Sequence, residues 1–540
     1  MREPASGATA AATVPAGGGG TAASAPSPTA AEAPGFDRRL AALILFTAGW
    51  LAFALVAAWR CRAEAIDDFF ITYRYAQNLV AGDGLVFNPG EHAFGTTAPG
   101  YALLLGAAAA LTRLPVHWLG EAATVLGLVL LALLGAACSR DRLGEALLGG
   151  TLVVTSGYLW LHHGGEVAVV LALLAAAGCA AERRTMFAGM LAGVLAGLAT
   201  WTRPDALVAA AALGGLLWWR RRGLPWGYAV VAAAIVLAGV AAAWWWFGQP
   251  LPGTIAAKRA QAAWSSTNWP SGWRFWVAGY EYLGNLYGGP WLPLLLAGGL
   301  AGQVLLFPRA PLAVQVVSLY GLGVSVAYPL LGVPFYTWYA VPGLVAVLYG
   351  VAYSLGAAVR TAAVERPPRP LVLRVSAAAV TVVLAAVLAS PLRRSFDLVS
   401  HPQPGAARYR LYRETAEWLA AHSRRDERFA AAEVGTLGYF SRRGVTDLLG
   451  LVSPEVVGRI RRGDLASSFL RHPTPLVVES SYFPLSALAG QPWFGRKYQL
   501  AARFGDDRSW VRVYRLKPGE ELPRRRKAWT PASERRRRGG

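Results

Sequence analysis

The chain has 540 residues, of which 54% are hydrophobic and 15% charged, with 21 tryptophans. This composition is too apolar for a soluble chain of that length, so it excludes an ordinary soluble enzyme and predicts a membrane protein. The formal net charge of +21 would suit nucleic acid, but much of it lies in short loops between apolar runs and in the C-terminal tail. That distribution predicts the lipid bilayer, and not nucleic acid, as a partner.

The N-terminal segment, residues 1–37, consists mainly of Ala, Gly, Pro, Ser and Thr. It cannot bury enough apolar surface to offset the entropy of ordering, so we expect a disordered cytoplasmic tail. An apolar run from about 40 to 59 follows and is long enough to cross a bilayer. Arg38 and Arg39 precede this run and place the N-terminus in the cytoplasm, so the loop over 60–97 is predicted to lie on the outer face.

This first outer loop opens with two adjacent carboxylates, Asp67 and Asp68. Carboxylates beside a membrane domain are costly to keep, which favours a functional site, although Asp67 alone would also suit the N-cap of a helix. From Phe69 to Val80 the apolar and aromatic residues recur at helical spacing, which predicts a helix lying along the membrane surface.

The predicted transmembrane domain covers 38–391, and we expect it to be all-α, with about 11–12 spanning helices. A second large outer loop is predicted at 248–288. Basic residues bound the apolar runs on the opposite side, at Arg220–Arg222, at Arg309 and between 360 and 374. Because short basic loops stay in the cytoplasm, these clusters determine the expected orientation of the spans.

The apolar runs between the two outer loops conflict with this orientation. They lie at about 98–112, 119–138, 145–161, 166–181, 185–201, 204–219 and 225–247. Their number is odd, and an odd number of crossings cannot return the chain to the face that it left. One short run must therefore lie in the interface or re-enter the membrane, and we consider 145–161, 166–181 and 204–219 as the candidates.

The composition changes again at about residue 392. Arg408 to His422 has the pattern of an amphipathic helix, and short apolar runs between Gly and Pro turns predict strands at Phe429–Val434, Pro475–Glu479 and Trp510–Tyr514. We expect a small extracytoplasmic α/β domain over 392–518 and a disordered basic tail over 519–540. The three cysteines lie in or beside apolar segments, which supports neither a disulfide framework nor a metal cluster. No phosphate-binding glycine loop or Gly-x-Ser-x-Gly elbow is found, which argues against ATP-driven transport and a serine hydrolase.

Two stretches of the first outer loop form a pattern, DDFFITYRYAQN from Asp67 and GLVFNPGE from Gly84. They resemble the first outer loop of the terminal arabinofuranosyltransferases of actinobacterial cell walls. That family belongs to the GT-C type of multi-spanning glycosyltransferases, which use polyprenyl-phosphate sugars. Further stretches agree with the family in the same order along the chain: TRPD at 202–205, FGQPLPGTIAAK at 247–258, PFYTWYAVP at 334–342, and AEVGTLGY at 432–439 with DLLGLVSP at 447–454.

The chain also departs from the family pattern near the site. Residues 94–101 read FGTTAPGY, where the family usually has Glu-Gly-Tyr-Thr-x-Pro-Leu-Trp, so a carboxylate and two aromatic side chains are lost or reduced. The Gly-Met-Glu-Thr stretch of many relatives is reduced to Gly165-Glu166-Val167. The resemblance therefore implies a polyprenyl-phosphate donor but leaves the sugar and the acceptor open.

The chemistry of such a transfer can be stated without the family. A polyprenyl-phosphate sugar carries its own leaving group, so the protein must deprotonate an acceptor hydroxyl and hold the departing phosphate. Asp67 and Asp68 are the candidate catalytic pair: one is the general base, and the other orients the acceptor or holds a divalent cation. The residues do not say which is which, and the resemblance favours Asp67 as the base. Beyond that possible cation we expect no cofactor and no metal-ligand set.

The remaining candidate residues divide by role. The candidate ligands of the donor phosphate are Lys258, Arg74, Arg259 and Arg203, although Lys258 would also suit a headgroup-contacting lysine, and Arg74 could simply pair with acids of its own loop. The candidate substrate-binding residues are Tyr73, Glu91, Thr97, Tyr336 and Trp338, and the aromatic ones would also suit an interfacial belt.

The predicted activity is the transfer of a sugar to a hydroxyl of a cell-envelope glycan, glycolipid or protein at the outer face of the plasma (inner) membrane. Two other classes remain open: a transporter or flippase of lipid-linked sugars, and a non-enzymatic envelope assembly protein. A transporter would favour an internal two-fold repeat, which the sequence does not show. An assembly protein would not be expected to keep paired carboxylates beside the first span.

Overall fold

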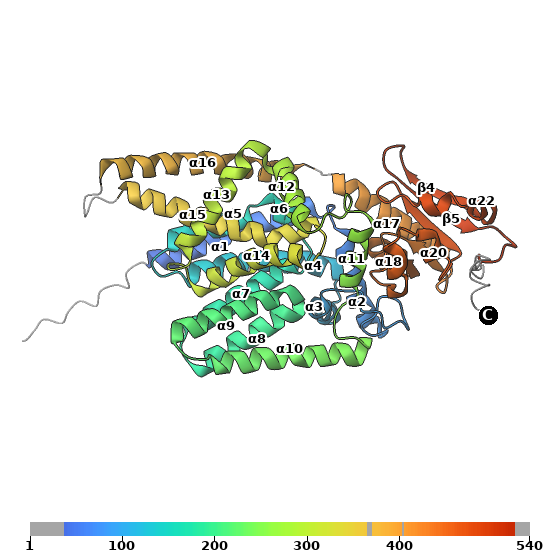
Figure 1. The fold of residues 1–540 in the computed structure, drawn as a ribbon, viewed down its shortest axis with the longest axis horizontal. Coiled ribbons are helices and arrows are strands. Elements are labelled where there is room, and N and C mark those ends of the chain that lie inside the picture. Colours follow the sequence, from blue (N-terminus) through green and yellow to red (C-terminus); the bar gives the residue numbers. More distant parts are fainter. Residues whose placement is uncertain (1–36, 364–369, 402–403, 524–540) are drawn as a thin grey trace, which may run out of the picture. The chain divides into compact units, whose positions relative to one another are not determined.

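A computed structural model describes residues 37–363, 370–401 and 404–523, and the chain from Leu43 onward forms one compact unit. The two predicted disordered tails lie almost entirely outside the described residues. Most of the described chain is helical, and Figure 1 shows its elements in chain order. Up to residue 400 the helices are α1 Arg38–Cys61, α2 Asp67–Ala81, α3 Pro99–Thr112, α4 Val116–Ala137, α5 Leu143–Val154, α6 Gly157–Leu161, α7 Val167–Glu182, α8 Met186–Thr202, η1 Pro204–Ala206, α9 Leu207–Arg221, α10 Trp226–Phe247, α11 Thr254–Trp264, α12 Trp273–Tyr287, η2 Gly289–Trp291, α13 Leu292–Leu306, α14 Leu312–Leu330, η3 Thr337–Ala340, α15 Val341–Ala363 and α16 Leu371–Ser400.

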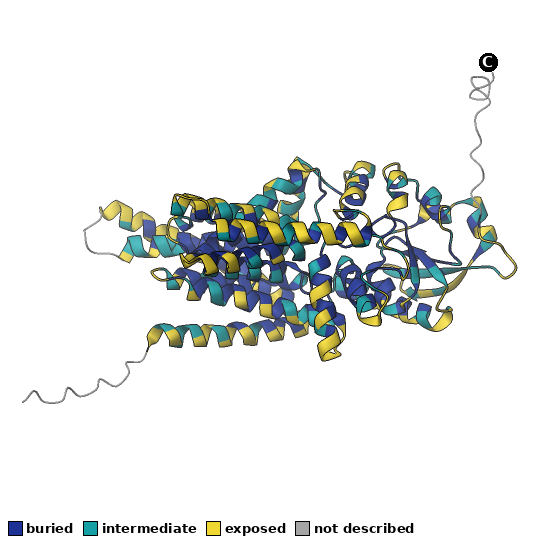
Figure 2. Cartoon of the chain, turned by 90° about the horizontal axis from the view of Figure 1, so that it is seen from below, coloured by how far each residue is buried: buried dark blue, intermediate teal, exposed yellow. Residues whose placement is uncertain are grey.

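Seven of the described helical stretches are long and apolar enough to cross a membrane. They contain α1, α4, α10, α13, α14, α15 and α16, and the shorter apolar helices α3, α7 and α8 accompany them. Apolar side chains on the outer faces of these helices are exposed, as on α10, where Trp245 is 81% exposed, and the interior between the helices is buried (Figure 2). A soluble protein would bury such faces, so the chain is a multi-pass membrane protein.

The helix α3 resolves the parity conflict of the sequence. It packs along α2, where a Cβ atom at Gly106 would lie 3.0 Å from the side chain of Leu79. Its first turn contacts the end of α8 at Trp201, and its last residues line the same cleft as Tyr439 of the C-terminal region. Both ends of α3 therefore lie on one side of the helical bundle. A run at 98–112 with both ends on one side would restore the parity, and this run was not among the three suspected from the sequence.

The environment of α2 also differs from the expectation. The predicted helix at the membrane surface exists, but ten of its 15 residues are buried. It packs between α3 and an α-helix of the C-terminal region, α18 (Gly435–Ser441), and its aromatic residues Phe70, Tyr73 and Tyr75 belong to the central apolar cluster. Because both faces of α2 are covered by protein, it is a core element and not a surface helix.

The C-terminal region carries a five-stranded sheet in the order β2-β1-β3-β5-β4. β1 is parallel to β2 and β3, whereas β5 is antiparallel to β3 and β4. The strands are β1 Arg428–Ala431, β2 Gly444–Asp447, β3 Leu476–Ser480, β4 Tyr498–Gly505 and β5 Trp510–Leu516, and the helices are α17 Pro404–His422, α18, η4 Pro454–Val456, α19 Val457–Ile460, α20 Leu465–Phe469, α21 Ser486–Ala489 and α22 Pro492–Lys497.

The two faces of this sheet are covered by different elements. Phe429, Val478 and Val513 point into the cluster that contains residues of α17 and α2, because alternate residues of a strand face opposite sides. Ala430 and Val477 face the second cluster, formed with α20, α21 and α22. The first face therefore shares one apolar cluster with α2 of the membrane domain.

The expected helix Arg408–His422 lies within α17, and the three expected strands overlap β1, β3 and β5. The sequence missed β2, which is only four residues long, and β4, most of whose side chains are exposed or half-buried. It also missed a disulfide between Cys138 and Cys179, which joins the end of α4 to α7 and leaves Cys61 as a free thiol. Spacing along the chain could not reveal this pairing, because the two cysteines meet only through helix packing.

Candidate active site

The first residue of α2, Asp67, binds the N-terminus of α18. Its two carboxylate oxygens accept hydrogen bonds from the backbone N–H groups of Gly435 (2.9 Å) and Thr436 (2.8 Å). The N-cap position of its own helix is held by Ile66, whose side chain makes no cap bond. Burial raises the pKa of Asp67, and the two N–H donors partly oppose this. Asp67 therefore caps a helix that is distant in sequence, and its hydrogen-bonding capacity is directed toward that helix.

The next residue, Asp68, points away from α18 and toward Lys258. Its carboxylate lies 3.4 Å from the ammonium of Lys258 on α11, and its side chain is 28% exposed whereas that of Lys258 is 8% exposed. Consecutive residues on a helix point about 100° apart, which is why the two carboxylates diverge. Asp68 is thus the more accessible of the pair and stands beside a buried cation.

Aromatic side chains surround Lys258. Its ammonium lies 4.3 Å from the ring centre of Tyr336, 5.2 Å from that of Trp338 and 5.3 Å from that of Tyr339, and it donates a hydrogen bond of 3.1 Å to the Tyr339 hydroxyl. Burial alone would lower the pKa of Lys258, but Tyr339 and Asp68 outweigh it and raise the pKa. The lysine is therefore a cation at neutral pH, held by ring faces and one carboxylate.

Asp68 and Lys258 line a narrow polar pocket. The same pocket is lined by Glu166 at the start of α7, by Thr97 at the end of the first outer loop, and by Trp338. Two further hydroxyls, those of Thr72 and Thr96, lie in its wall and hydrogen-bond each other at 2.9 Å. Two carboxylates, one ammonium and several hydroxyls thus converge on one small space.

A second network, of ion pairs and hydrogen bonds around Arg203, adjoins this pocket at Glu166. Arg203 forms ion pairs with Glu166 and with Asp205, the latter at 2.7 Å. It also donates to the Tyr328 hydroxyl at 2.9 Å, and the hydroxyls of Tyr328 and Tyr320 bond Asp205. Each of the three guanidinium nitrogens donates to a partner, so Arg203 orders the acids around the pocket while adding positive charge to its wall.

A larger apolar cavity of about 530 Å³ adjoins the polar pocket. The two share Thr97, Thr254 and Lys258, so the ammonium stands where they meet. The guanidinium of Arg259 lines the cavity and, in the described part of the chain, has no hydrogen-bond or ion-pair partner. Its other walls are mainly apolar and aromatic: Pro204, Leu207, Val208, Ala211, Pro252, Ile255, Val324, Ala327, Tyr328, Leu331, Val333 and Tyr339.

Several predicted site residues come together here. Asp68, Lys258, Thr97 and Trp338 line the polar pocket, and Arg203 and Arg259 line the adjoining cavity. Tyr336 contacts Lys258 through its ring, and its hydroxyl bonds the side chain of Gln261.

Three others lie elsewhere. Arg74 is buried and donates to the carbonyl groups of Phe87, Gly438 and Arg443. Tyr73 donates to the carbonyl of Gly164 at 2.7 Å, and Glu91 pairs with Arg428 of the C-terminal region. The structure does not bring these three to the polar pocket; their contacts join segments of the fold.

Sequence reasoning did not assign a role to Glu166, Asp205, Thr254 or Tyr339. The first two carried a signal, since each is an acid next to an apolar run, where an unpaired charge is costly. Thr254 and Tyr339 lie within stretches that the resemblance covers but carry no charge to mark them. In the described residues, no group of three or more His, Cys, Asp or Glu side chains is placed to hold a metal ion.

Comparisons with known proteins bear on the fold. Residues 402–514 match the model of a domain of unknown function, DUF8728. No curated protein matches the sequence. Among solved structures, the chain is similar to ArnT from Cupriavidus metallidurans bound to undecaprenyl phosphate, with 16% identity, a TM-score of 0.55 and coverage of 88% of this chain and 98% of that chain. The apo state of the same ArnT gives 14% identity, a TM-score of 0.49 and the same coverage.

The likeness to the lipid-bound ArnT structure concerns the fold, because the identity is low. It extends over most of both chains. The predicted fold class is confirmed: an all-α polytopic membrane domain of the GT-C type with a small C-terminal α/β domain. Within that fold, the pocket at Asp68 and Lys258 is the candidate active site.

Proposed function

We propose that this GT-C-fold protein is a membrane glycosyltransferase that transfers a sugar from a polyprenyl-phosphate donor to an acceptor hydroxyl. One observation carries the proposal: a mainly apolar cavity meets a pocket with two carboxylates at a buried, aromatic-caged lysine. A lipid chain, a phosphate and a reacting hydroxyl need these three environments side by side. The similar ArnT structure holds undecaprenyl phosphate, which supports the class of donor.

The cations of the cavity suit the donor phosphate. Lys258 stands at the junction, and Arg259 has N–H donors without partners in the described chain. Charge grows on the phosphate as the bond from its oxygen to the anomeric carbon breaks, and preorganised cations stabilise that charge most in a site that excludes water. Arg203 adds a positive electrostatic potential at the cavity wall, while its own hydrogen bonds go to Glu166, Asp205 and Tyr328.

Asp68 is the proposed general base. It takes the proton of the acceptor hydroxyl, the acceptor oxygen bonds to the anomeric carbon, and the prenyl phosphate leaves with the electron pair of the broken bond. Asp67 is a positioning residue, because both of its carboxylate oxygens accept backbone hydrogen bonds from α18. Its role is to hold the first turn of α2, and with it Asp68, in place.

We further propose that the site opens at the outer face of the plasma membrane and acts on a cell-envelope glycan, glycolipid or protein. The basic clusters at the opposite ends of the spans support that orientation. Single cysteines at Ser266 and Asp507, both exposed, are expected to react with an impermeant thiol reagent on intact cells, whereas one at Gly223 is not. Protection of the cysteine at Ser266 together with reaction of the one at Asp507 would remove Lys258 from the outer face.

The decisive experiment follows a labelled donor. Purified full-length protein in vesicles receives polyprenyl-phosphate sugars, and the resemblance to arabinofuranosyltransferases makes a pentose the first to test. Thin-layer chromatography is expected to show release of prenyl phosphate by the wild type and not by Asp68→Asn. Donor that stays intact but reaches the opposite leaflet would support a flippase and overturn the proposal.

A further inference from the structure

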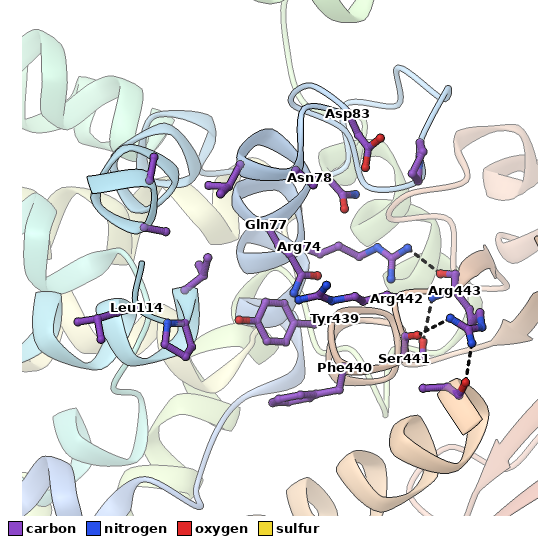
Figure 3. Close-up of a pocket in the computed structure, with 18 of the residues that line it drawn as sticks. Arg74, Gln77, Asn78, Asp83, Leu114, Tyr439, Phe440, Ser441, Arg442 and Arg443 are labelled. Carbon is purple, nitrogen blue, oxygen red and sulfur yellow. Dashed lines mark hydrogen bonds between the residues drawn. The ribbon is translucent and has the colours of Figure 1, made fainter. Parts of the chain in front are cut away.

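A second large hollow lies on the other side of α2. This cleft, of about 1010 Å³, is walled by α2, by the turn between α3 and α4, and by the end of α18. Figure 3 shows Arg442 close to both Arg74 and Tyr439 within it. It shares no lining residue with the pocket of Asp68 or with the apolar cavity. We call it the arginine cleft.

The cleft is strongly basic. Five arginines line it, and Asp83 is the one carboxylate among its lining residues: the arginines are Arg74, Arg113, Arg425, Arg442 and Arg443. The guanidinium of Arg74 donates only to backbone carbonyls, and that of Arg443 to carbonyls and the Ser423 hydroxyl. The other three are exposed and have no side-chain partner in the described residues. Their N–H groups are therefore free to bind an anion.

The surroundings of Arg74 are in keeping with a basic cleft. Burial lowers the pKa of Arg74 to about 9, and the nearby Arg428 and Arg442 lower it further, while Asp83 and Glu91 partly oppose this. An anion bound among these arginines would remove that repulsion. Asp83 alone does not, because it is a single exposed carboxylate against five guanidinium groups.

Two of the free arginines occupy an unusual backbone conformation. Arg113 ends α3 with φ 59° and Arg442 ends α18 with φ 55°. Glycine adopts this left-handed conformation without the steric cost that a Cβ atom brings, and it is the common residue at such helix ends. Both positions hold arginine despite that cost, and both line the arginine cleft.

The rim of the cleft belongs to the membrane boundary. The span α4 begins at Val116, in the wall of the cleft. Leu111 is 86% exposed and Trp118 is 56% exposed on either side of the turn that carries Arg113. Exposed Leu and Trp at the end of a spanning helix are typical of the interface between headgroups and acyl chains. An anion in this cleft would therefore sit at headgroup depth beside a surface for its acyl chains.

We propose that the arginine cleft binds the phosphate of an anionic membrane phospholipid, as a site separate from the donor cavity. The headgroup bridges Arg113 of the membrane domain and Arg425 and Arg442 of the C-terminal region, and the acyl chains lie along the apolar rim. An acidic glycan would use the same arginines but gain nothing from exposed Leu111 and Trp118. The lipid thereby stabilises the contact between the two regions, and this inference does not depend on the proposed glycosyl transfer.

The test uses the full-length protein in detergent and native mass spectrometry with added phosphatidylglycerol or phosphatidylcholine. It is run in a Lys258→Gln background as well, so that lipid in the donor cavity is recognised. We expect wild type and Lys258→Gln to prefer phosphatidylglycerol. The triple variant R113Q/R425Q/R442Q should lose that preference by about tenfold or more, because it removes three charged donors to the phosphate.

Two variants make the result specific. R461Q/R462Q/R496Q removes the same charge from exposed arginines outside the cleft and is expected to keep the preference. R113K/R425K/R442K keeps the cleft's charge and is expected to retain most of the preference, which excludes a folding defect as the cause. An unchanged preference in the triple glutamine variant would overturn the proposal. So would a thermal stabilisation by inorganic phosphate equal to that by phosphatidylglycerol, or selective binding of an acidic glycan without lipid.

Discussion

The two sides of α2 use charge in different ways. On one side, Asp67 and Arg74 are buried, and their side chains hydrogen-bond backbone groups, mostly of the C-terminal region. On the other side, Asp68 and Lys258 face each other at 3.4 Å beside a pocket, with Asp68 partly exposed. One helix therefore attaches a domain with one face and presents the proposed reactive groups with the other.

The difference teaches how to separate structural from catalytic charge in this fold. A buried carboxylate whose oxygens both accept backbone N–H donors has little capacity left for a substrate, and its removal leaves those donors without partners. A carboxylate beside a cation and an open pocket can exchange its partner for a substrate hydroxyl. Attachment through Asp67 and Arg74 also fixes the position of Asp68, so the first face serves the second.

The largest expected effect comes from Asp68→Asn. Loss of the base should lower kcat for glycosyl transfer by about 10²–10⁴, while the thermal midpoint in detergent stays unchanged. The matched variant Asp67→Asn should do the reverse, lowering the midpoint because an Asn side chain cannot accept from both N–H groups of α18, and keeping kcat per folded molecule. If Asp67→Asn abolished transfer in a protein of normal stability, Asp67 would be the base and the comparison would fail.

Lys258→Gln should give the next largest loss. It removes a charged donor from the departing phosphate, and deletion of one such stabilising donor typically costs about 10²–10³ in kcat. Transfer assays over a range of donor concentrations measure it. Arg259→Gln is the companion variant on the adjacent residue: because Arg259 is exposed, its loss should mainly raise the donor KM. An effect of Lys258→Gln on KM alone would mean that this cation binds the ground state only.

Arg74→Met tests the attaching face. It leaves carbonyl groups of Phe87, Gly438 and Arg443 without their donor, at roughly 1–3 kcal/mol for each that stays buried. We expect a lower thermal midpoint and faster proteolysis of the C-terminal region, with transfer per folded molecule retained. Arg461→Met, at an exposed position of the same region, serves as the control. Loss of transfer without loss of stability would return Arg74 to the donor site that the sequence predicted.

Hydropathy predicted the helices well because the residues of an apolar run themselves determine that it forms an apolar helix. The resemblance of short motifs placed Asp68, Lys258 and Trp338 near one another, and the structure brings them to one pocket. What the sequence could not supply were contacts made across long separations. The partner of Asp67 lies at Gly435, and nothing around Asp67 distinguishes a cap for that helix from a catalytic base.

The same reason explains the errors of topology. The run that became α3 is as apolar as a spanning helix. Its exposed leucines suit the interface as well as the bilayer interior, so its composition does not distinguish the two locations. Only its packing shows that both of its ends lie on one side of the helical bundle. The strand β4 was missed for a related reason: most of its side chains are at least partly exposed, so the apolar alternation that marks a half-buried strand is weak.

The smallest expected effect concerns Glu433, which lies close to both faces of α2. It forms an ion pair with Arg408 at 3.4 Å, two residues before the N–H group that Asp67 binds. Burial raises the pKa of Glu433 from 4.5 to about 7, with further contributions from the nearby charges of Asp67 and Asp68. The folded protein therefore holds this proton more tightly than the unfolded chain does.

The sign of the pH dependence follows from that difference. The stability contributed by this proton is fully present below pH 4.5, the unfolded pKa, and is lost as the pH rises through about 7. Glu433→Gln has no proton to lose, so its thermal midpoint should fall less than that of the wild type between these two values. Glu414→Gln, on the exposed side of α17, should leave the wild-type slope unchanged. An equal slope in Glu433→Gln would show that Glu433 is already ionised in the folded protein, and that its charge adds to those of Asp67 and Asp68 on both faces of α2.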